Sequence, residues 1–253
     1  MDISNTIIRI RNRYRRSLSI HYGQRLLELR PKFPIISFTF DDFPRSALLE
    51  GGAILQRHGI CGTYYVSLGL LGRELPAGPG FLIEDLRQVI AEGHELGCHT
   101  FAHCHSWETT PGVFEKSIIK NKHALGELVP GAAFKTLSYP IACPRPRTKR
   151  RAARHFVCCR GGGESFNVGP TDVSNLQARF LEKSRDNPDA LKRLIDENTR
   201  ASGWLILATH DIAETPTPFG CTPAFFEVIV QWAVTSGARI LPVARAWEEI
   251  TAK

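Results

Sequence analysis

The stretch ISFTFDDFP, residues 36–44, joins an apolar run to two adjacent carboxylates. Its β-branched and aromatic residues are typical of a buried β-strand. The two aspartates repel each other, and a buried carboxylate is costly unless it is paired, hydrogen-bonded or bound to a cation. Because successive side chains of a strand point to opposite faces, we expect Asp41 and Asp42 to do different jobs.

Further strand-like runs alternate with helical segments along the 253-residue chain. They are residues 61–69, 94–99, 134–140, 155–161, 177–183, 204–210 and 238–243. This alternation indicates parallel strands joined by helical crossovers. A closed or nearly closed α/β barrel is favoured over an open doubly wound sheet, because no Gly-rich dinucleotide fingerprint follows any strand. We expect one barrel domain, residues 33–253, after an N-terminal arm of residues 1–32.

The arm is basic, and so is a second segment in the middle of the chain. The net charge is +7, and much of it lies in Arg9, Arg11, Arg13, Arg15 and Arg16 and in Arg145, Arg147, Lys149, Arg150, Arg151 and Arg154. One interpretation is peripheral contact with anionic lipid headgroups or an acidic glycan. The other is a solvated surface, or a helical arm that docks on its own domain or on a second subunit in an oligomer. Nucleic-acid binding is not expected, since no recognition motif accompanies the charge.

Targeting signals and cysteine usage indicate the compartment. No apolar run reaches the length of a membrane span, and the N-terminus has no apolar core of a secretory signal, so we expect a cytoplasmic protein. The seven cysteines are then expected to be reduced thiols. Cys98 and Cys104 flank a histidine pair, so either could be a metal ligand.

The chemically active residue types follow the predicted strands. Asp41 and Asp42 come after the first strand, His99 after the third and His210 after the seventh. In a βα barrel these positions share the carboxyl face, where active sites lie. His99 and His103 are four residues apart, which places both imidazoles on one face of a helical turn. Two histidines and one carboxylate form the three-ligand set of a catalytic zinc site, which leaves one coordination position open.

Four short motifs occur in a characteristic order: TFDD (39–42), HTFAH (99–103), LSYP (137–140) and THD (209–211). The chain thereby resembles the polysaccharide deacetylase family, the NodB-homology domain of carbohydrate esterases, over about residues 35 to 245. The resemblance implies a distorted (β/α)7 barrel. It also implies an enzyme that removes N-acetyl or O-acetyl groups from oligo- or polysaccharides by metal-activated water, with zinc as the expected ion.

The resemblance also implies roles for single residues. Asp42, His99 and His103 would bind the metal, Asp41 would act as general base, and His210 would act as general acid. The backbone N–H of Ile141 would stabilise the oxyanion.

Several positions depart from the family pattern. Ser138 stands where many members have an arginine that braces the catalytic aspartate, and Ile141 replaces an aromatic residue, with Tyr139 as the retained aromatic. We expect Arg160 to supply the missing positive charge near Asp41.

Two further residues complete the expected site. Asp172 is the candidate to support His210. Trp204 is either a platform for a sugar ring or part of the core.

Two alternatives remain open. The barrel could hydrolyse an amide that is not a sugar, or it could be a non-catalytic carbohydrate-binding relative. The presence of both Asp41 and His210 favours catalysis, because binding alone needs neither a base nor an acid. The expected substrate is an acetylated cytosolic oligosaccharide or a lipid-linked precursor.

Overall fold

The computed structural model describes residues 3–252, with side chains from residue 10 onward. Its centre is a curled parallel sheet in the order β10-β11-β2-β3-β6-β7-β8. The strands are β2 (Ile35–Phe40), β3 (Thr63–Val66), β6 (Glu95–Cys98), β7 (Thr136–Ser138), β8 (Cys158–Arg160), β10 (Arg179–Phe180) and β11 (Trp204–Thr209), and β12 (Arg239–Ile240) pairs with the start of β2. Each of these strands falls within a run predicted from the sequence.

The sheet curls until its two edges nearly meet. Between β8 and β10, residues 173–178 continue the hydrogen bonding: Arg160 bridges to Leu176, and the N–H of Gly163 donates to the carbonyl of Ala178 at 2.9 Å. The structure is therefore the expected distorted (β/α)7 barrel and not an open doubly wound sheet.

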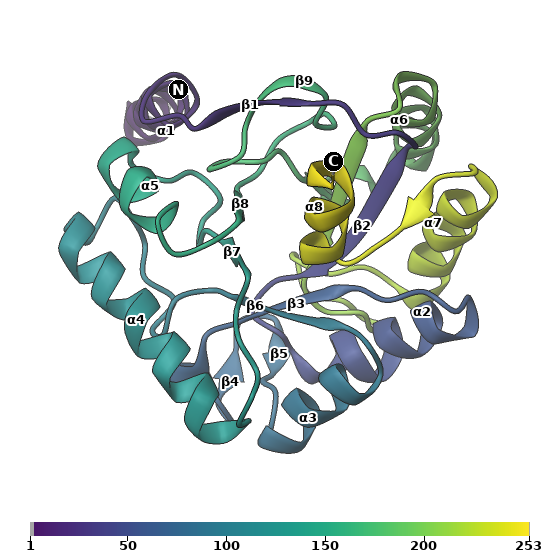
Figure 1. Ribbon diagram of the computed structural model, residues 1–253, viewed down its shortest axis with the longest axis horizontal. Helices are drawn as coiled ribbons and strands as arrows, with labels where there is room; N and C mark the ends of the chain where they lie inside the picture. The colour runs from purple at the N-terminus through teal and green to yellow at the C-terminus, as the bar shows by residue number, and fades with distance from the viewer. Residues whose placement is uncertain (1–2, 253) are drawn as a thin grey trace.

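Helices cover the outside of the barrel (Figure 1). They are α2 (Ala53–Arg57, after a π-helical turn at Ala47–Gly52), α3 (Ile83–Ala91), α4 (Pro111–Leu128), α5 (Pro146–Ala152), α6 (Pro188–Ala201) and α7 (Pro223–Thr235). In α4, α6 and α7 a Thr or Asn side chain caps the first turn and a proline follows it. This combination satisfies exposed N–H groups and presets the first helical residue.

The last helix, α8 (Val243–Thr251), was not predicted and closes the amino end of the barrel. The N–H of Val243 donates to Oγ1 of Thr63, and the N–H of Ala244 donates to a carboxylate oxygen of Glu95. Thr63 and Glu95 begin β3 and β6. The carboxyl ends of the strands, where the motifs lie, are therefore on the opposite side of the barrel.

The alternation of side chains along β2 determines which way Asp41 faces. Phe38 and Phe40 pack against Phe226 of α7, at ring-centroid distances of 5.6 and 5.7 Å. The hydroxyl of Ser37, on the other face, accepts a hydrogen bond from the Trp204 indole at 3.0 Å. Asp41 continues the alternation of Ser37, so its carboxylate faces the interior of the barrel.

The N-terminal arm lies on the barrel. Helix α1 (Ile3–His21) contacts α5, and β1 (Leu26–Leu29) pairs antiparallel with β9 (Gly169–Asp172). Nζ of Lys149 in α5 donates to the carbonyl of Ser19 at 2.5 Å. These contacts favour an arm that docks on its own domain, while the division at residue 32 stays a prediction. The side chain of Arg9 lies outside the described residues.

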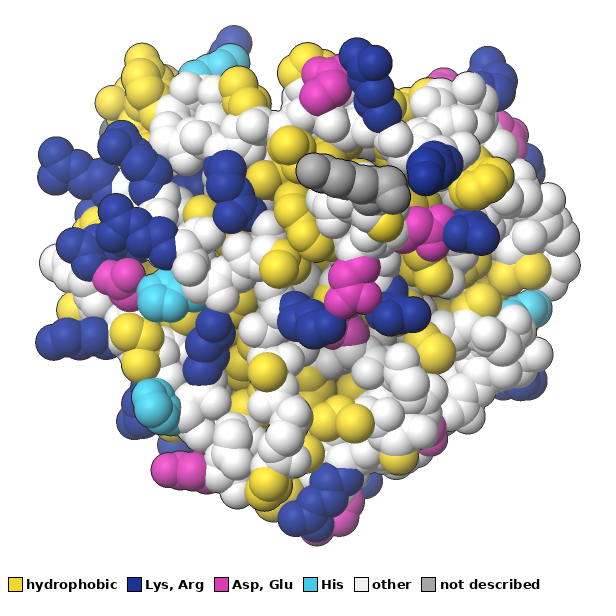
Figure 2. Space-filling view, viewed as in Figure 1, with side chains coloured by type: hydrophobic (Ala, Val, Ile, Leu, Met, Phe, Trp, Pro, Cys, Tyr) yellow, Lys and Arg dark blue, Asp and Glu magenta, His cyan; other side chains and the backbone are white. Residues whose placement is uncertain are grey.

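Two more features complete the fold. A short hairpin of β4 (Glu74–Leu75) and β5 (Gly78–Pro79) follows β3, and 3-10 turns occur at Leu68–Leu70 and Leu181–Ser184. Figure 2 shows Lys and Arg side chains gathered on the side of the molecule that α1 and α5 form. Among the helices that the structure describes, none combines the length and apolarity needed to cross a membrane.

Candidate active site

The register of the sheet brings the motif residues to one level at the carboxyl ends of the strands. The N–H of Asp41 donates to the carbonyl of Thr209 at 2.9 Å, so Asp41 and His210 leave neighbouring strands side by side. On the other side of the barrel Ser138 pairs with Arg160 across β7 and β8. Most of the expected site therefore assembles as the strand-end argument predicts.

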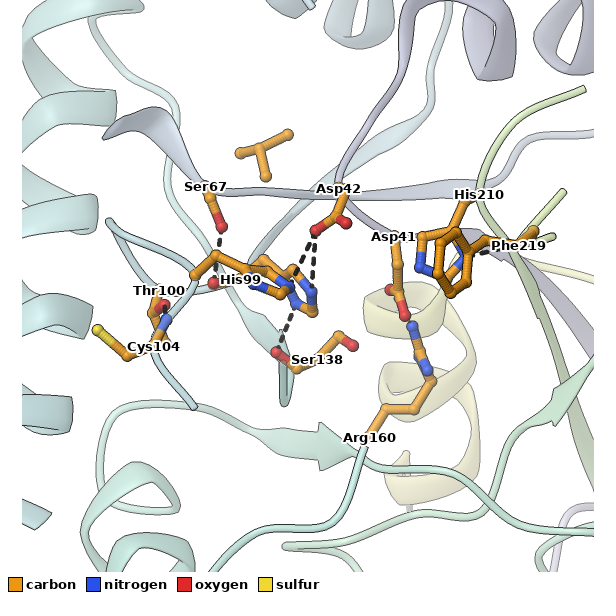
Figure 3. Close-up of polar contacts among 12 residues, drawn as sticks. Asp41, Asp42, Ser67, His99, Thr100, Cys104, Ser138, Arg160, His210 and Phe219 are labelled. Atoms are coloured by element: carbon orange, nitrogen blue, oxygen red, sulfur yellow. Dashed lines mark hydrogen bonds and ion pairs between the residues drawn. The ribbon is translucent and has the colours of Figure 1, made fainter. Parts of the chain in front are cut away.

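Asp42, His99 and His103 form a compact cluster (Figure 3). Oδ1 of Asp42 lies 3.2 Å from Nε2 of His103 and 3.5 Å from Nε2 of His99. The candidate ligand atoms of the three residues all lie within 4.8 Å of one another. This Oδ1 is buried and has no hydrogen-bond partner among the described residues, which is costly unless another group binds it. Two imidazole nitrogens and one carboxylate oxygen fit a divalent cation such as zinc.

His99 is oriented for this task by its second nitrogen. Nδ1 donates to the backbone carbonyl of Ser138 at 2.8 Å, which directs Nε2 toward Asp42. Burial lowers the pKa of His99 to about 4, so the ring is neutral at neutral pH and Nε2 keeps its lone pair. Metal-binding histidines commonly donate their other N–H in this way. Ser138, which stands where many family members have an arginine, thus orients His99 through its backbone carbonyl group.

The backbone is strained on the two loops that carry this cluster and on the neighbouring loop that carries Ile141. Positive φ angles, unusual for residues other than glycine, occur in pairs after β2, β6 and β7: Asp42 (60°) and Phe43 (54°), Thr100 (61°) and His103 (49°), and Ile141 (64°) and Ala142 (56°). Such conformations are concentrated at functional sites, where the surrounding structure holds them. Oγ1 of Thr100 accepts the N–H of Cys104 at 2.9 Å and stabilises the turn that presents His103.

Asp41 forms a buried ion pair with Arg160. Nη2 of Arg160 reaches across from the end of β8 and donates to Oδ1 of Asp41. The guanidinium also lies 4.9 Å from the centre of the Tyr65 ring. Burial alone raises the pKa of Asp41, but the positive charge of Arg160, with smaller contributions from His99 and His210, outweighs it and holds the pKa at about 2. The expected placement of Arg160 beside Asp41 is found, and Asp41 is ionised at neutral pH.

His210 stands on the side of Asp41 away from the histidine pair (Figure 3). Its half-buried ring is stacked near Phe180, with 6.2 Å between ring centroids, and lies 5.5 Å from the Phe219 ring. Nδ1 lies 3.2 Å from the Phe219 carbonyl and donates to it. The neighbouring Asp211 accepts the N–H and hydroxyl of Thr217 and so fixes the loop that carries Phe219. This arrangement leaves Nε2 of His210 without a hydrogen-bond partner among the described residues.

The structure corrects the expectation for Asp172. Its carboxylate accepts hydrogen bonds from Nζ of Lys149 at 2.6 Å, from the N–H of Arg25 at 2.9 Å and from Ser174. Among the described residues no hydrogen bond joins it to His210. Asp172 lies at the end of β9, which pairs with β1 of the arm, and its negative charge pairs with Lys149.

Two aromatic candidates are also placed in the core. Trp204 is fully buried at the start of β11, which is the amino end of the barrel and not the catalytic end. It is therefore core and not a sugar platform. Tyr139 is buried as well, and its hydroxyl donates to the Ser174 carbonyl at 3.0 Å, so its ring is not open to a substrate.

Ile141 is exposed, in the left-handed turn that follows Pro140. Among the described residues its backbone N–H has no protein acceptor, which suits a donor to an oxyanion. The two candidate cysteine ligands are not in the cluster of the described ligands. Burial raises the pKa of Cys98 to about 11, so it is a neutral thiol.

Sequence reasoning missed one acidic residue near the site. Glu182 follows β10, and one of its carboxylate oxygens is buried without a hydrogen-bond partner among the described residues. Burial raises the pKa of Glu182, and the nearby His210 partly offsets this. No motif marks this residue, and the preceding strand is only two residues long.

Comparison with protein sequences agrees with this geometry. The profile of the family described as polysaccharide deacetylase matches residues 29–156, half of the chain. A gellan lyase from a Bacillus species is 26% identical over 156 residues. That similarity covers 54% of this chain but only 6% of the much longer relative.

Solved structures share the fold along most of the chain. A chitin deacetylase from the fungus Colletotrichum lindemuthianum has a TM-score of 0.62 at 17% identity, covering 90% of this chain and 92% of that one. A family 4 acetyl xylan esterase from Clostridium thermocellum, in complex with cobalt, has a TM-score of 0.59 at 17% identity, covering 84% and 90%. A pseudoenzyme of carbohydrate esterase family 4 from Bacillus anthracis also has a TM-score of 0.59, at 12% identity, covering 87% and 67%.

At these identities the structural likenesses establish the fold alone. The family follows from the profile match, which includes the residue pair Asp41–Asp42 and the histidine pair His99–His103. This chain belongs to the polysaccharide deacetylase family.

Proposed function

We propose that the protein is a metal-dependent hydrolase that removes acetyl groups from an N-acetylated or O-acetylated oligo- or polysaccharide. One observation carries the proposal: the Asp42–His99–His103 cluster lies beside the ion pair of Asp41 and Arg160. A ligand set and a separate, oriented carboxylate at the same face of a barrel are the parts that hydrolysis of an acyl group needs.

Asp42, His99 and His103 would hold the cation, with zinc as the expected ion. When bound, the cation polarises the acyl carbonyl and acidifies water, which matters here because a carboxylate with a pKa of about 2 is a weak base. The donor set and the unpartnered Oδ1 of Asp42 support this assignment.

The other residues move protons and stabilise charge. Asp41, held in place by Arg160, accepts the proton of the attacking water. Nε2 of His210 gives a proton to the departing amine or alcohol as the bond to the acetyl group breaks and acetate is released. The N–H of Ile141 donates to the oxyanion that forms on the carbonyl oxygen.

The substrate class rests on the family and on what its relatives are. The solved relatives include a chitin deacetylase and an acetyl xylan esterase, which differ in the bond that carries the acetyl group. We propose an acetylated oligosaccharide or a lipid-linked saccharide as substrate, in the cytoplasm. Contact of the basic arm with an anionic membrane or an acidic glycan belongs to the same proposal.

The test is acetate release from a panel of N- and O-acetylated oligosaccharides, with simple non-sugar amides as further substrates. We expect release from saccharides only, its loss on treatment with a chelator, and its return when zinc is added. His103→Ala should lose both metal and activity, whereas His123→Ala, an exposed histidine on α4, should keep both.

Two results would contradict the proposal. Hydrolysis of the simple amides alone would indicate the non-sugar alternative. Saccharide binding without acetate release at any metal concentration would indicate a non-catalytic role, as in the pseudoenzyme that shares this fold.

A further inference from the structure

A cavity of about 260 Å³ lies between helix α1 and the loops that follow β6 and β7. We call it the α1 pocket, and its lining includes Asn12, Arg15, Arg16, His105, Trp107 and Ile141. It is somewhat smaller than the pockets of about 300–1,000 Å³ that enclose whole ligands. Its size therefore suits one substituent of a larger molecule.

The pocket shares its wall with the candidate active site. Ile141, whose N–H we propose as the donor to the oxyanion, is one of the lining residues. His105 is another, two residues after the candidate ligand His103. A group bound in the pocket would therefore lie next to the candidate active site, within reach of the same substrate molecule.

The pocket is positively charged. Among residues 10–252, whose side chains the structure describes, neither Arg15 nor Arg16 forms an ion pair with a carboxylate. The guanidinium of Arg15 lies 5.2 Å from the centre of the Trp107 ring, and that of Arg145 lies 5.5 Å from it. Glu108 contributes a negative charge nearby, but it is exposed and faces His105 at 3.8 Å.

The wall that faces the arginines is fixed in position. The indole N–H of Trp107 donates to the carbonyl of Cys143 at 2.7 Å. Nη2 of Arg145 donates to the carbonyl of Trp107 at 3.2 Å, and the N–H of Arg145 donates to Ser106 at 3.0 Å. These bonds join the loop after β6 to the loop after β7, so the pocket is preorganised.

We propose that the α1 pocket binds an anionic group, a carboxylate or a phosphate, on the saccharide whose acetyl group is removed. Arginine suits this role because its planar guanidinium donates two parallel hydrogen bonds to a carboxylate or phosphate. The basic arm then acts as part of the substrate site and selects acidic saccharides. The proposal rests on the proposed deacetylase function, and its first test does not depend on catalysis.

The first test measures binding by tryptophan fluorescence in the chelator-treated protein. Glucuronic acid, glucose 1-phosphate and neutral N-acetylglucosamine are titrated separately. We expect a saturable change with one or both anions, weaker at high salt, and none with the neutral sugar. Trp107→Phe should remove the signal, and the double variant Arg15→Gln/Arg16→Gln should weaken anion binding at least tenfold. Arg13→Gln, on the same helix but outside the pocket, is the matched control and should bind as the unaltered protein does.

The responses distinguish the two sources of charge. A response to glucuronic acid alone indicates an acidic sugar, and a response to glucose 1-phosphate alone indicates a phosphate such as that of a lipid-linked precursor. Equal affinity in the double variant, or no response to either anion, overturns the proposal even if the enzyme is active. If the anions bind but no substrate is hydrolysed, the α1 pocket is confirmed as an anion site and the proposed deacetylase function is contradicted.

The second test compares turnover of acetylated oligosaccharides with and without a charged neighbour. The double variant should lower kcat/KM by about tenfold to a hundredfold for the anionic substrate, and should leave the neutral substrate within about twofold. A loss of equal size on both substrates would mean that the arginines act on the fold of the site, which contradicts a role in selecting charge.

Discussion

Two buried ion pairs in this protein each join a cationic side chain to an aspartate, but their surroundings differ. Arg160 and Asp41 meet inside the barrel, with side chains 1% and 6% exposed. Lys149 and Asp172 meet under helix α1, with side chains 0% and 11% exposed. The Asp172 carboxylate also accepts from Arg25 and Ser174, whereas Arg160 supplies the one hydrogen bond to the Asp41 carboxylate among the described residues.

This difference separates a pair that holds two segments together from the pair that we propose to be reactive. Every strong contact of Lys149 and Asp172 is with protein, since Lys149 also donates to the Ser19 carbonyl. Asp41 keeps one carboxylate oxygen for another molecule. We call Lys149–Asp172 the saturated pair, because protein groups take up its hydrogen bonds, and Asp41–Arg160 the unsaturated pair. The saturated pair joins two segments of the chain. The unsaturated pair has a carboxylate oxygen that can accept a proton from a substrate or a water.

The largest expected effect is on turnover at the unsaturated pair. Asp41→Asn removes the proposed base but leaves Asp42, His99 and His103 in place, so metal content should not change. Turnover should fall by about two to four orders of magnitude, the usual contribution of a positioned base, and added metal should not restore it. The check is metal analysis together with acetate release.

Asp42→Asn is the matched variant for this test. It removes an anionic ligand, so metal affinity should fall, and part of the activity should return at high metal concentration. Equal metal loss in the two variants would show that both carboxylates bind the cation and that Asp41 is not the base.

At the saturated pair the expected effect is on stability. Lys149→Met leaves Asp172 buried beside an apolar side chain, which should lower the free energy of unfolding by about 3–5 kcal/mol. Turnover of a neutral acetylated saccharide per folded molecule should be unchanged, because no hydrogen bond joins Asp172 or Lys149 to Asp41, Asp42, His99, His103 or His210 among the described residues. Urea unfolding and activity assays at matched temperature test this.

Lys135→Met is the control. Lys135 pairs with Glu248 at 2.7 Å on the surface, where the two side chains are 57% and 42% exposed, so its loss should cost less than about 1 kcal/mol. A fall in turnover of folded Lys149→Met would mean that the arm affects the catalytic residues directly.

The same two ion pairs show which placements could be predicted from the sequence. Arg160 was placed correctly because it ends a parallel strand, and all parallel strands of the barrel end on one face. Asp172 is the last residue of β9, which is antiparallel to β1, and its partner in that pairing, Leu26, lies more than 140 residues away in the chain. The polar sequence of β9 carries no signal for that pairing, so the sequence did not show that Asp172 lies outside the barrel.

The other successes and failures have the same origin. The longest barrel strands, β2 and β11, are apolar runs, and the candidate metal ligands lie in local motifs, so both were predictable. Trp204 was assigned two roles although it starts its strand, and a residue at the start of a barrel strand lies away from the catalytic face. Glu182 and the carbonyl group of Ser138 have no sequence signature, because their roles depend on folding alone.

A smaller effect concerns pH. The pKa of Asp41 is lowered from 3.8 to about 2 in the folded protein. A depressed carboxyl pKa stabilises the fold above the unfolded value, and this contribution is lost as pH falls from about 4 to about 2. It amounts to about 2 kcal/mol. Unfolding free energies of the unaltered protein and Asp41→Asn should therefore converge over this range.

His99 provides the reference for that measurement. Its pKa is lowered from 6.5 to about 4, so its contribution to stability is lost as pH falls from about 6.5 to about 4, a higher range than that of Asp41. Metal-free samples of both proteins should show this loss, and it should extend to lower pH in Asp41→Asn, because the Asp41 carboxylate raises the pKa of His99. Curves that stay parallel below pH 4 would mean that Asp41 is not held ionised by Arg160.

The smallest expected effect is at Tyr139, which lies between the two pairs. It follows Ser138, whose carbonyl orients His99, and its hydroxyl donates to the carbonyl of Ser174, which itself contacts Asp172. Tyr139→Phe keeps the buried ring and removes the hydroxyl with its hydrogen bond to Ser174, so the free energy of unfolding should fall by about 0.5–1.5 kcal/mol. Turnover and metal content should stay unchanged, because the hydroxyl is buried against Ser174 and away from the candidate metal ligands. A loss of turnover without a loss of stability would place the hydroxyl in the reaction, whereas losses in both would show that the saturated pair positions His99 through Tyr139.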